Sequence, residues 1–311
     1  MMLFGVIVLA LAIIIMLACY VSFRIAIVKG RQVHLTKPEE IHKNSPLYPY
    51  IDRFTAAGVW FESQTKIPME IKSYDGLSLY GEYIPNEKSK TTILLMHGFR
   101  SSRDDFCLAL KFYRSLGFNI LLIDQRGHGK SEGRYITYGA KEKYDCLSWV
   151  NALIEKYGKD QKIILSGISM GASTVLMAST LDLPEQVKAI IADSGFTNGF
   201  DIVKLTAKKI FRYVPNWFIE ATNFLCRIFA DFDLKDDNTL IAMKTCQLPV
   251  MFIHGTADSI VPYEMTLRTY SMLKDKKEIV IAPGAEHGMG FLMEGEKCAE
   301  TIKGFLDKYL D

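Results

Sequence analysis

The chain has 311 residues, 49% of them hydrophobic and 23% charged, a composition that excludes collagen-like, coiled-coil and wholly disordered chains. Its 37 basic and 35 acidic residues leave a formal net charge of +2. This balance disfavours a dedicated nucleic-acid binder, because no cationic surplus exists to neutralise a row of phosphates. The mean hydropathy of +0.09 is high for a water-soluble enzyme, and the excess is local.

The first expected element is a transmembrane helix. Residues 3–23 carry no charged side chain, and as a helix rising about 1.5 Å per residue they span roughly 30 Å, the thickness of a bilayer core. They also lack the polar stripe of a helix packed on a globular core. Because Arg24, Lys29 and Arg31 follow, the positive-inside rule places the C-terminal flank in the cytoplasm. We therefore expect a single-pass anchor in the cell membrane over residues 1–28, with a cytoplasmic catalytic domain.

A cleaved or lipidated start is the alternative interpretation of this segment. Leu17-Ala18-Cys19 faintly resembles a lipoprotein cleavage site, but the sequence after Cys19 stays apolar. A cleaved signal peptide has a basic n-region and an apolar region of about 7–15 residues, and this segment has neither. The six cysteines form no CxxC motif, and no His/Cys cluster has zinc-ligand spacing. The sequence thus predicts free thiols in a reducing compartment and no metal site.

Residues 29–66 are expected to be a linker with some short amphipathic structure, and residues 67–311 to be one α/β domain. After a hairpin signal centred on Asp75 and Gly76, short apolar runs alternate with longer helical segments. This alternation indicates a mostly parallel sheet with helices on both faces. The interval 196–240 lacks a strand pattern and is rich in aromatic residues, so we expect a helical insertion there. The expected strands are 69–74, 77–84, 92–96, 119–123, 162–166, 187–192, 250–253 and 278–282, and the expected helices are 104–116, 140–157, 170–181, 263–273 and 294–309.

The sharpest chemical signal is the GxSxG pattern centred on Ser169. It follows a strand signal and precedes a helical one, which predicts a tight elbow that exposes the Ser169 hydroxyl. A serine hydroxyl is a weak nucleophile near neutral pH and needs an adjacent base, which in turn needs an orienting group. A glycine-rich turn with an incidental serine is the alternative interpretation.

His287 is the best candidate for the base, because it lies just past the last strand signal and can reach the carboxyl edge of the sheet. Asp258 follows the strand at 250–253 and is the preferred third member, with Asp193 as its competitor. The order serine, acid, histidine is that of hydrolases with a nucleophile elbow. For the oxyanion, the expected donors are the backbone amides of Met170, which begins the helix after Ser169, and Phe99, in the loop after the strand at 92–96.

These residues together resemble the α/β-hydrolase superfamily from about residue 69 to the C-terminus. The segments HGF at 97–99, DQRGHGKS at 124–131, GISMG at 167–171 and the pair Asp258 and His287 look like serine hydrolases related to monoacylglycerol lipases and serine aminopeptidases. The resemblance implies a nucleophilic Ser169, a chiefly structural DQRGHGKS loop, and a cap over the active site at 196–240. The loop reads HGFR, not HGGG, and His97 has Ser102 where an HxxxxD motif has its aspartate, which weakens an acyltransferase interpretation.

The sequence therefore predicts a membrane-anchored serine hydrolase that cleaves carboxylester, lipid ester or thioester bonds through an acyl-enzyme, with no cofactor. Its expected partners are a small acyl ester or lipid substrate and the membrane. One alternative is a serine peptidase of the aminopeptidase-like type. Another is a catalytically inactive, membrane-tethered binding protein, against which the intact set Ser169, Asp258 and His287 argues.

Overall fold

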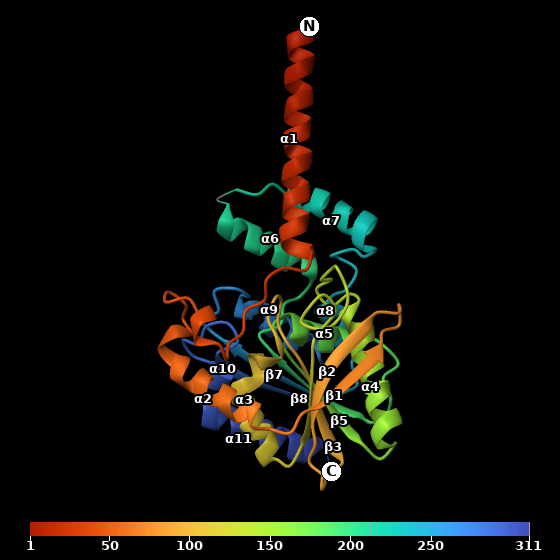
Figure 1. Cartoon of the computed structure of the whole chain (residues 1–311), viewed down its shortest axis with the longest axis vertical. Helices are drawn as coiled ribbons and strands as arrows, with labels where there is room; N and C mark the ends of the chain where they lie inside the picture. Colours follow the sequence, from red (N-terminus) through yellow and green to blue (C-terminus); the bar gives the residue numbers. More distant parts are fainter. Residues whose placement is uncertain (212, 311) are drawn as a thin grey trace.

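The computed structural model describes residues 1–211 and 213–310 (Figure 1). These residues form one sheet of eight strands in the order β1-β2-β4-β3-β5-β6-β7-β8. β1 pairs antiparallel with β2, β2 pairs antiparallel with β4, and the pairs from β4 to β8 are parallel. The strands are β1 (Ile67–Lys72), β2 (Ser78–Ile84), β3 (Thr91–Met96), β4 (Asn119–Ile123), β5 (Lys162–Ile168), β6 (Val187–Asp193), β7 (Val250–Gly255) and β8 (Lys277–Ala282).

Helices cover both faces of the sheet, which explains why its central strands are apolar on both sides. All five residues of β4 and all six of β7 are buried. The helices of the described residues are α1 (Met2–Ile27), α2 (Ile51–Glu62), α3 (Cys107–Ser115), α4 (Glu142–Tyr157), α5 (Met170–Ala178), α6 (Gly199–Ile210), α7 (Asn216–Ala230), α8 (Thr239–Thr245), α9 (Tyr263–Met272), α10 (Gly290–Met293) and α11 (Gly295–Leu310), with short 3₁₀ helices at Pro38–Glu40, Tyr48–Tyr50 and Arg103–Phe106.

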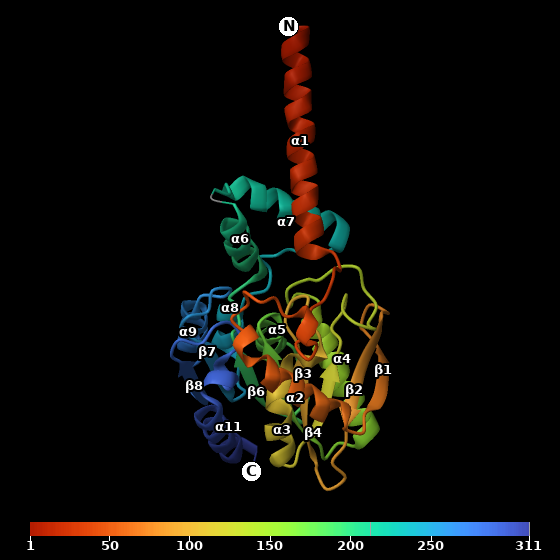
Figure 2. The same cartoon turned by 60° about the vertical axis from the view of Figure 1, so that its left-hand side comes forward.

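Two hydrophobic clusters lie on opposite sides of the sheet. On one side, α4, α5 and α8 pack on the strands through residues such as Trp149, Val175 and Met243. On the other side, α3 and α11 pack through residues such as Leu110 and Phe305, and α2 joins them (Figure 2). The mostly parallel sheet with helices on both faces confirms the expected α/β-hydrolase fold.

Residues 29–66, the segment expected to be a linker, fold against the body of the domain. α2 packs against α3, and Phe54, Ala57 and Phe61 are buried there. Ile41, ahead of α2, is buried in a small cluster together with Phe54 and residues after β8. This segment therefore contributes to the core, and it begins where the long helix α1 ends.

α6 and α7 lie apart from the sheet and across the lower part of α1 in both views (Figures 1 and 2). They occupy most of the interval 196–240, in which a helical insertion was expected. α1 packs against α7: Phe23 is buried with its ring centroid 5.8 Å from that of Phe229, and the Thr222 hydroxyl lies 3.2 Å from that of Ser22. Beyond this contact α1 projects away from the domain. Within the described residues it is the one helix that is long and apolar enough to cross a membrane.

Candidate active site

Ser169 occupies a strained elbow between the end of β5 and the start of α5. Its φ of 56° lies in the left-handed region that non-glycine residues seldom adopt. Glycine is required on either side: a Cβ on Gly171 would lie 1.8 Å from the carbonyl oxygen of Met96, and one on Gly167 would lie 2.2 Å from the backbone of Gly171. The close approach of β3, β5 and α5 thus holds the turn and directs the serine side chain out of the sheet.

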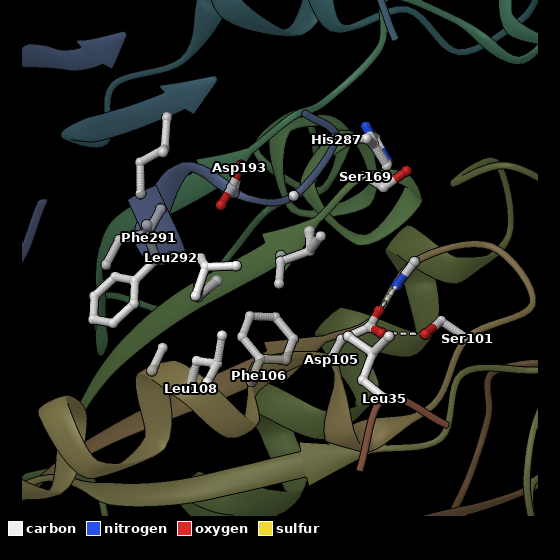
Figure 3. A pocket seen from close by; sticks show the side chains of 18 of the residues that line it. Leu35, Ser101, Asp105, Phe106, Leu108, Ser169, Asp193, His287, Phe291 and Leu292 are labelled. Carbon is white, nitrogen blue, oxygen red and sulfur yellow. Dashed lines mark hydrogen bonds between the residues drawn. The ribbon is translucent and has the colours of Figure 1, made fainter. Parts of the chain in front are cut away.

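The structure brings Asp258 and His287 together at the carboxyl edge of the sheet. His287 lies in the loop after β8, and its Nδ1 is 2.7 Å from Oδ2 of Asp258, in the loop after β7. The other carboxylate oxygen, Oδ1, accepts the backbone amides of Ile260 and Val261, both at 2.8 Å. Ser169 and His287 line the same cavity and lie at the same end of it (Figure 3). This arrangement can orient an imidazole beside a serine hydroxyl.

A second histidine, His254, contacts the same carboxylate and was not among the site residues expected from the sequence. Nε2 of His254 lies 3.0 Å from Oδ2 of Asp258, and its Nδ1 lies 2.7 Å from the hydroxyl of Thr266. The His254 ring is fully buried. The sequence did hold a signal for this contact: His254 and Asp258 are four residues apart, and the turn that follows β7 brings their side chains together.

Hydrogen bonding keeps the buried Asp258 ionised. Burial by itself raises the pKa of this carboxyl group, but hydrogen bonds from His254 and His287 outweigh it and hold the pKa well below its ordinary value. Asp193, the competing candidate, lies at the end of β6 and accepts a hydrogen bond at 2.8 Å from the hydroxyl of its neighbour Ser194. Burial raises the pKa of Asp193. The two carboxylates therefore differ in environment, and Asp258 is the one that hydrogen-bonds His287.

The expected oxyanion donors lie on two neighbouring elements. Met170 is the first residue of α5, where helix amides point outward and carry partial positive charge. Phe99 follows β3, and its ring stacks on Tyr138 with centroids 5.2 Å apart. The amide of Gly98 donates to Oδ2 of Asp105 at 2.9 Å, which fixes the start of this loop.

Two buried histidines hold the same loop in place. Nε2 of His97 accepts the amide of Gln125 at 3.1 Å, and Nε2 of His128 accepts the amide of Arg100 at 3.0 Å. Burial lowers the pKa of His97 to about 4 and that of His128 to about 3, so both rings are neutral and can act as acceptors. The DQRGHGKS segment thus fastens the loop after β3, in line with the structural role that the resemblance implies.

Arg100 links this loop to the end of α1. One guanidinium nitrogen donates to the carbonyl oxygens of Ile25 at 2.7 Å and Val28 at 3.1 Å. The Arg100 carbonyl accepts the amide of Val33 at 3.1 Å, and its φ of 52° is left-handed. Carbonyls at a helix C-terminus lack helical partners, so the guanidinium both caps α1 and ties it to the candidate oxyanion loop.

A cavity of about 340 Å³ opens at Ser169 and extends between the sheet, α3 and α10. Ser169 and His287 lie at one end and Leu108 and Phe291 at the other (Figure 3). Its outer wall comes from residues 29–66 and consists of Leu35, Leu47 and Phe54. No described residue of the interval 196–240 lines it. This wall was not expected from the sequence, because its residues are separated by prolines and show no regular pattern.

One ionisable group in this apolar cavity was also missed. Asp105 lies near Gly98 and accepts hydrogen bonds from the Gly98 amide and the Ser101 hydroxyl. Burial outweighs these bonds and raises the pKa of Asp105 to about 7. Among the described residues, no group of three or more histidine, cysteine, aspartate or glutamate side chains could hold a metal ion.

The sheet order and the serine elbow at its carboxyl edge define an α/β hydrolase. A model of the prolyl oligopeptidase family matches residues 104–311, and the chain belongs to this family. Two curated relatives extend the likeness. The protein YqkD of Bacillus subtilis is 27% identical over 252 residues, which cover 81% of this chain and 82% of that protein. The lysophosphatidylserine lipase ABHD12 of Danio rerio is 26% identical over 236 residues, or 72% of this chain and 55% of that protein.

A solved structure agrees with this assignment. The esterase Pf2001 of Pyrococcus furiosus superposes with a TM-score of 0.65 at 25% identity, covering 80% of this chain and 93% of that one. The chain is therefore a hydrolase of the esterase, lipase and prolyl oligopeptidase type, which confirms the superfamily that the sequence motifs resembled.

Proposed function

We propose that this chain is a membrane-anchored serine hydrolase that cleaves ester-type bonds, with Ser169 as nucleophile, His287 as general base and Asp258 as the orienting acid. The observation that carries the proposal is the 2.7 Å contact between His287 and Asp258 at the mouth of the cavity that the strained Ser169 lines. The esterase Pf2001 and the lipase ABHD12 support an ester substrate by similarity.

The reaction follows from this geometry in two halves. His287 removes the proton of Ser169 while the hydroxyl oxygen attacks the acyl carbon, and the amides of Phe99 and Met170 stabilise the resulting oxyanion. Collapse of this intermediate breaks the bond to the leaving alcohol or thiol, which takes the proton from His287, and leaves an acyl group on Ser169. A water molecule deprotonated by His287 then hydrolyses the acyl-enzyme and regenerates the serine.

The acyl group would occupy the cavity beside Ser169. Leu35, Leu47, Leu108 and Phe291 give it apolar walls, which suit a hydrocarbon chain. Carboxylester, lipid ester and thioester substrates share this acyl part and differ in the leaving group. The cavity therefore suits all three kinds of substrate and does not distinguish between them.

Helix α1 would hold the hydrolase on the cell membrane. Its 26 residues reach about 39 Å at 1.5 Å per residue, enough for a bilayer core. Arg24, Lys29 and Arg31 follow its apolar part, so the positive-inside rule places the catalytic domain in the cytoplasm.

A fluorophosphonate probe tests the nucleophile. The full-length protein should be labelled and should hydrolyse p-nitrophenyl esters, whereas Ser169→Ala should lose labelling and at least about 1,000-fold of the activity, because the triad acts as a unit. Ser179→Ala, at the end of α5, is the matched control and should behave like the wild type. Equal labelling of wild type and Ser169→Ala would overturn the proposal.

A peptidase of the aminopeptidase-like type is the second candidate, because the matched family is that of prolyl oligopeptidase. The two functions share the nucleophile and differ in the scissile bond. A panel of acyl esters, acyl thioesters and aminoacyl amides separates them: turnover of medium-chain esters without turnover of aminoacyl amides supports the esterase, and the reverse supports the peptidase.

A further inference from the structure

One side of α7 carries an apolar stripe that the fold leaves uncovered. Trp217, Phe224 and Ile228 are 54%, 53% and 56% exposed. Together with Ala221 they lie at helical spacings of three and four residues and therefore share one side of the helix. The buried residues Ile219, Thr222, Asn223, Cys226 and Ala230 lie on the opposite side of α7, toward the domain and α1.

The end of α6 and the connection that follows it expose further large apolar side chains. Ile210, Phe211 and Tyr213 are 65%, 59% and 81% exposed. A contiguous apolar patch on a soluble protein usually marks a binding surface for a protein or a membrane. We call these six large side chains the cap outer surface: Ile210, Phe211, Tyr213, Trp217, Phe224 and Ile228.

The length of α1 shows how close this surface comes to a bilayer. Residues 2–18 are all exposed, whereas Cys19, Phe23 and Ile27 are buried against the domain. Seventeen residues at 1.5 Å each give about 25 Å, which is shorter than the roughly 30 Å of a bilayer core. To span the core, α1 must sink by about one further turn, to the level of Ser22 and Phe23. That level is where α7 packs against it.

The side chains near this level suit the boundary between hydrocarbon and headgroups. Trp217 and Tyr213 are the residue types enriched at membrane interfaces. Lys208 lies in the last turn of α6, and Arg24 follows the apolar part of α1. Basic residues beside apolar ones are typical of helices that lie in the interface plane. α6 and α7 lie across α1, between its exposed part and the catalytic body (Figure 2).

We propose that the cap outer surface is a membrane-docking surface, seated in the interfacial layer of the same bilayer that α1 spans. This inference rests on the anchor in the proposed function and extends it, because the chain then contacts the membrane at two elements. In this proposal the cap outer surface contacts the membrane and does not bind the acyl chain, because no described residue of 196–240 lines the acyl cavity. A domain docked in this way faces the cytoplasmic leaflet, so the substrate class that suits it is a lipid ester embedded in that leaflet.

Trp217 is a native probe of this docking. Trp149 is fully buried and Trp60 lies on α2, so the fluorescence difference between the full-length wild type and Trp217→Phe isolates Trp217. In vesicles of phosphatidylcholine with one-fifth phosphatidylglycerol, lipids brominated at carbons 6 and 7 should quench at least about half of this difference, and aqueous acrylamide should quench little of it. Strong acrylamide quenching overturns the proposal. Protection from both quenchers also overturns it, since a second protein then covers the stripe.

A pair of matched variants tests the functional consequence. Ile228→Asp should lower hydrolysis of an ester embedded in vesicles at least about fivefold and leave hydrolysis of a water-soluble acetate ester within twofold. Val59→Asp, at a 69% exposed position on α2, should change neither rate. Equal effects of both variants on the embedded ester contradict the docking surface.

Carbonate extraction separates failure of this inference from failure of the anchor. If carbonate releases the full-length chain from vesicles, the anchor itself is wrong. If the chain stays bound and reacts with fluorophosphonate while Trp217 is unquenched by brominated lipid, the docking surface alone is wrong.

Discussion

Two segments outside the sheet, 29–66 and 196–240, have opposite relations to the candidate active site. The first was expected to be a linker, yet Leu35, Leu47 and Phe54 form a wall of the cavity. The second was expected to form a cap over the active site, yet none of its described residues lines that cavity. The aromatic residues of 196–240 pack on α1, pack elsewhere in the same cluster as Phe196 does on Tyr138, or remain exposed, so this aromatic-rich segment is not the one that lines the cavity.

The largest expected effect is on stability. Phe54→Ala should lower the free energy of unfolding by about 3–4 kcal/mol, because it empties a buried aromatic site in the cluster that joins 29–66 to the domain. Phe224→Ala, on the exposed stripe of α7, should lower it by less than about 0.5 kcal/mol. Denaturant unfolding of both full-length variants in detergent micelles measures the difference. If both variants lost the same free energy of unfolding, residues 29–66 would contribute no more to the core than residues 196–240 do.

A smaller effect is expected on acyl selectivity. Leu35→Trp should fill part of the cavity near Ser169 and lower kcat/KM for an octanoate ester about tenfold relative to an acetate ester, because the longer chain needs the occupied space. Phe224→Trp adds similar bulk to the cap, outside the cavity, and should leave this ratio unchanged. A ratio that shifts with the cap variant instead would place the acyl chain under α6 and α7.

The smallest effect concerns Asp105, which lies beside the cavity wall. Its pKa is about 7 in the folded chain against 3.8 for an ordinary aspartate. Between these values the folded state binds more protons than the unfolded state, so stability from this group is present below about pH 4 and falls as pH rises toward 7. Asp105→Asn cannot ionise, so it should raise Tm by about 4 °C at pH 8.5 and by less at pH 5.

Thermal unfolding at both pH values checks this sign. Asp52→Asn, at an exposed position on α2, is the control and should follow the wild type at each pH. A larger gain for Asp105→Asn at pH 5 than at pH 8.5 would contradict the raised pKa.

The sheet could be predicted from sequence because its strands are short, continuous apolar runs. Burial on both faces demands such runs, and turns or helices separate them, so each of the eight expected strands overlaps an observed one. The proximity of His287 and Asp258 could also be predicted, because each follows a parallel strand and the carboxyl ends of parallel strands lie at the same edge of the sheet. The competitor Asp193 ends its strand at that edge too, and only geometry assigns the hydrogen bond to Asp258.

The parts that escaped prediction depend on contacts between distant residues. Nothing in the local pattern of Leu35, Leu47 or Phe54 indicates a cavity wall, because each fits against residues far along the chain. His254 and Asp105 contact residues close to them in sequence, and it is their burial that no local pattern indicated. The catalytic roles of Ser169, Asp258 and His287 stay predictions until the probe experiment.

Arg100 connects the long apolar helix α1 to the candidate oxyanion loop. Its guanidinium holds the last carbonyls of α1 while its backbone continues the loop that begins with Gly98 and Phe99. Removing residues 1–28 would therefore take away both of these acceptors from a guanidinium one residue from a proposed oxyanion donor. We therefore expect rates measured on such a fragment to differ from those of the full chain, because the loop that carries the proposed donor loses its tie to α1.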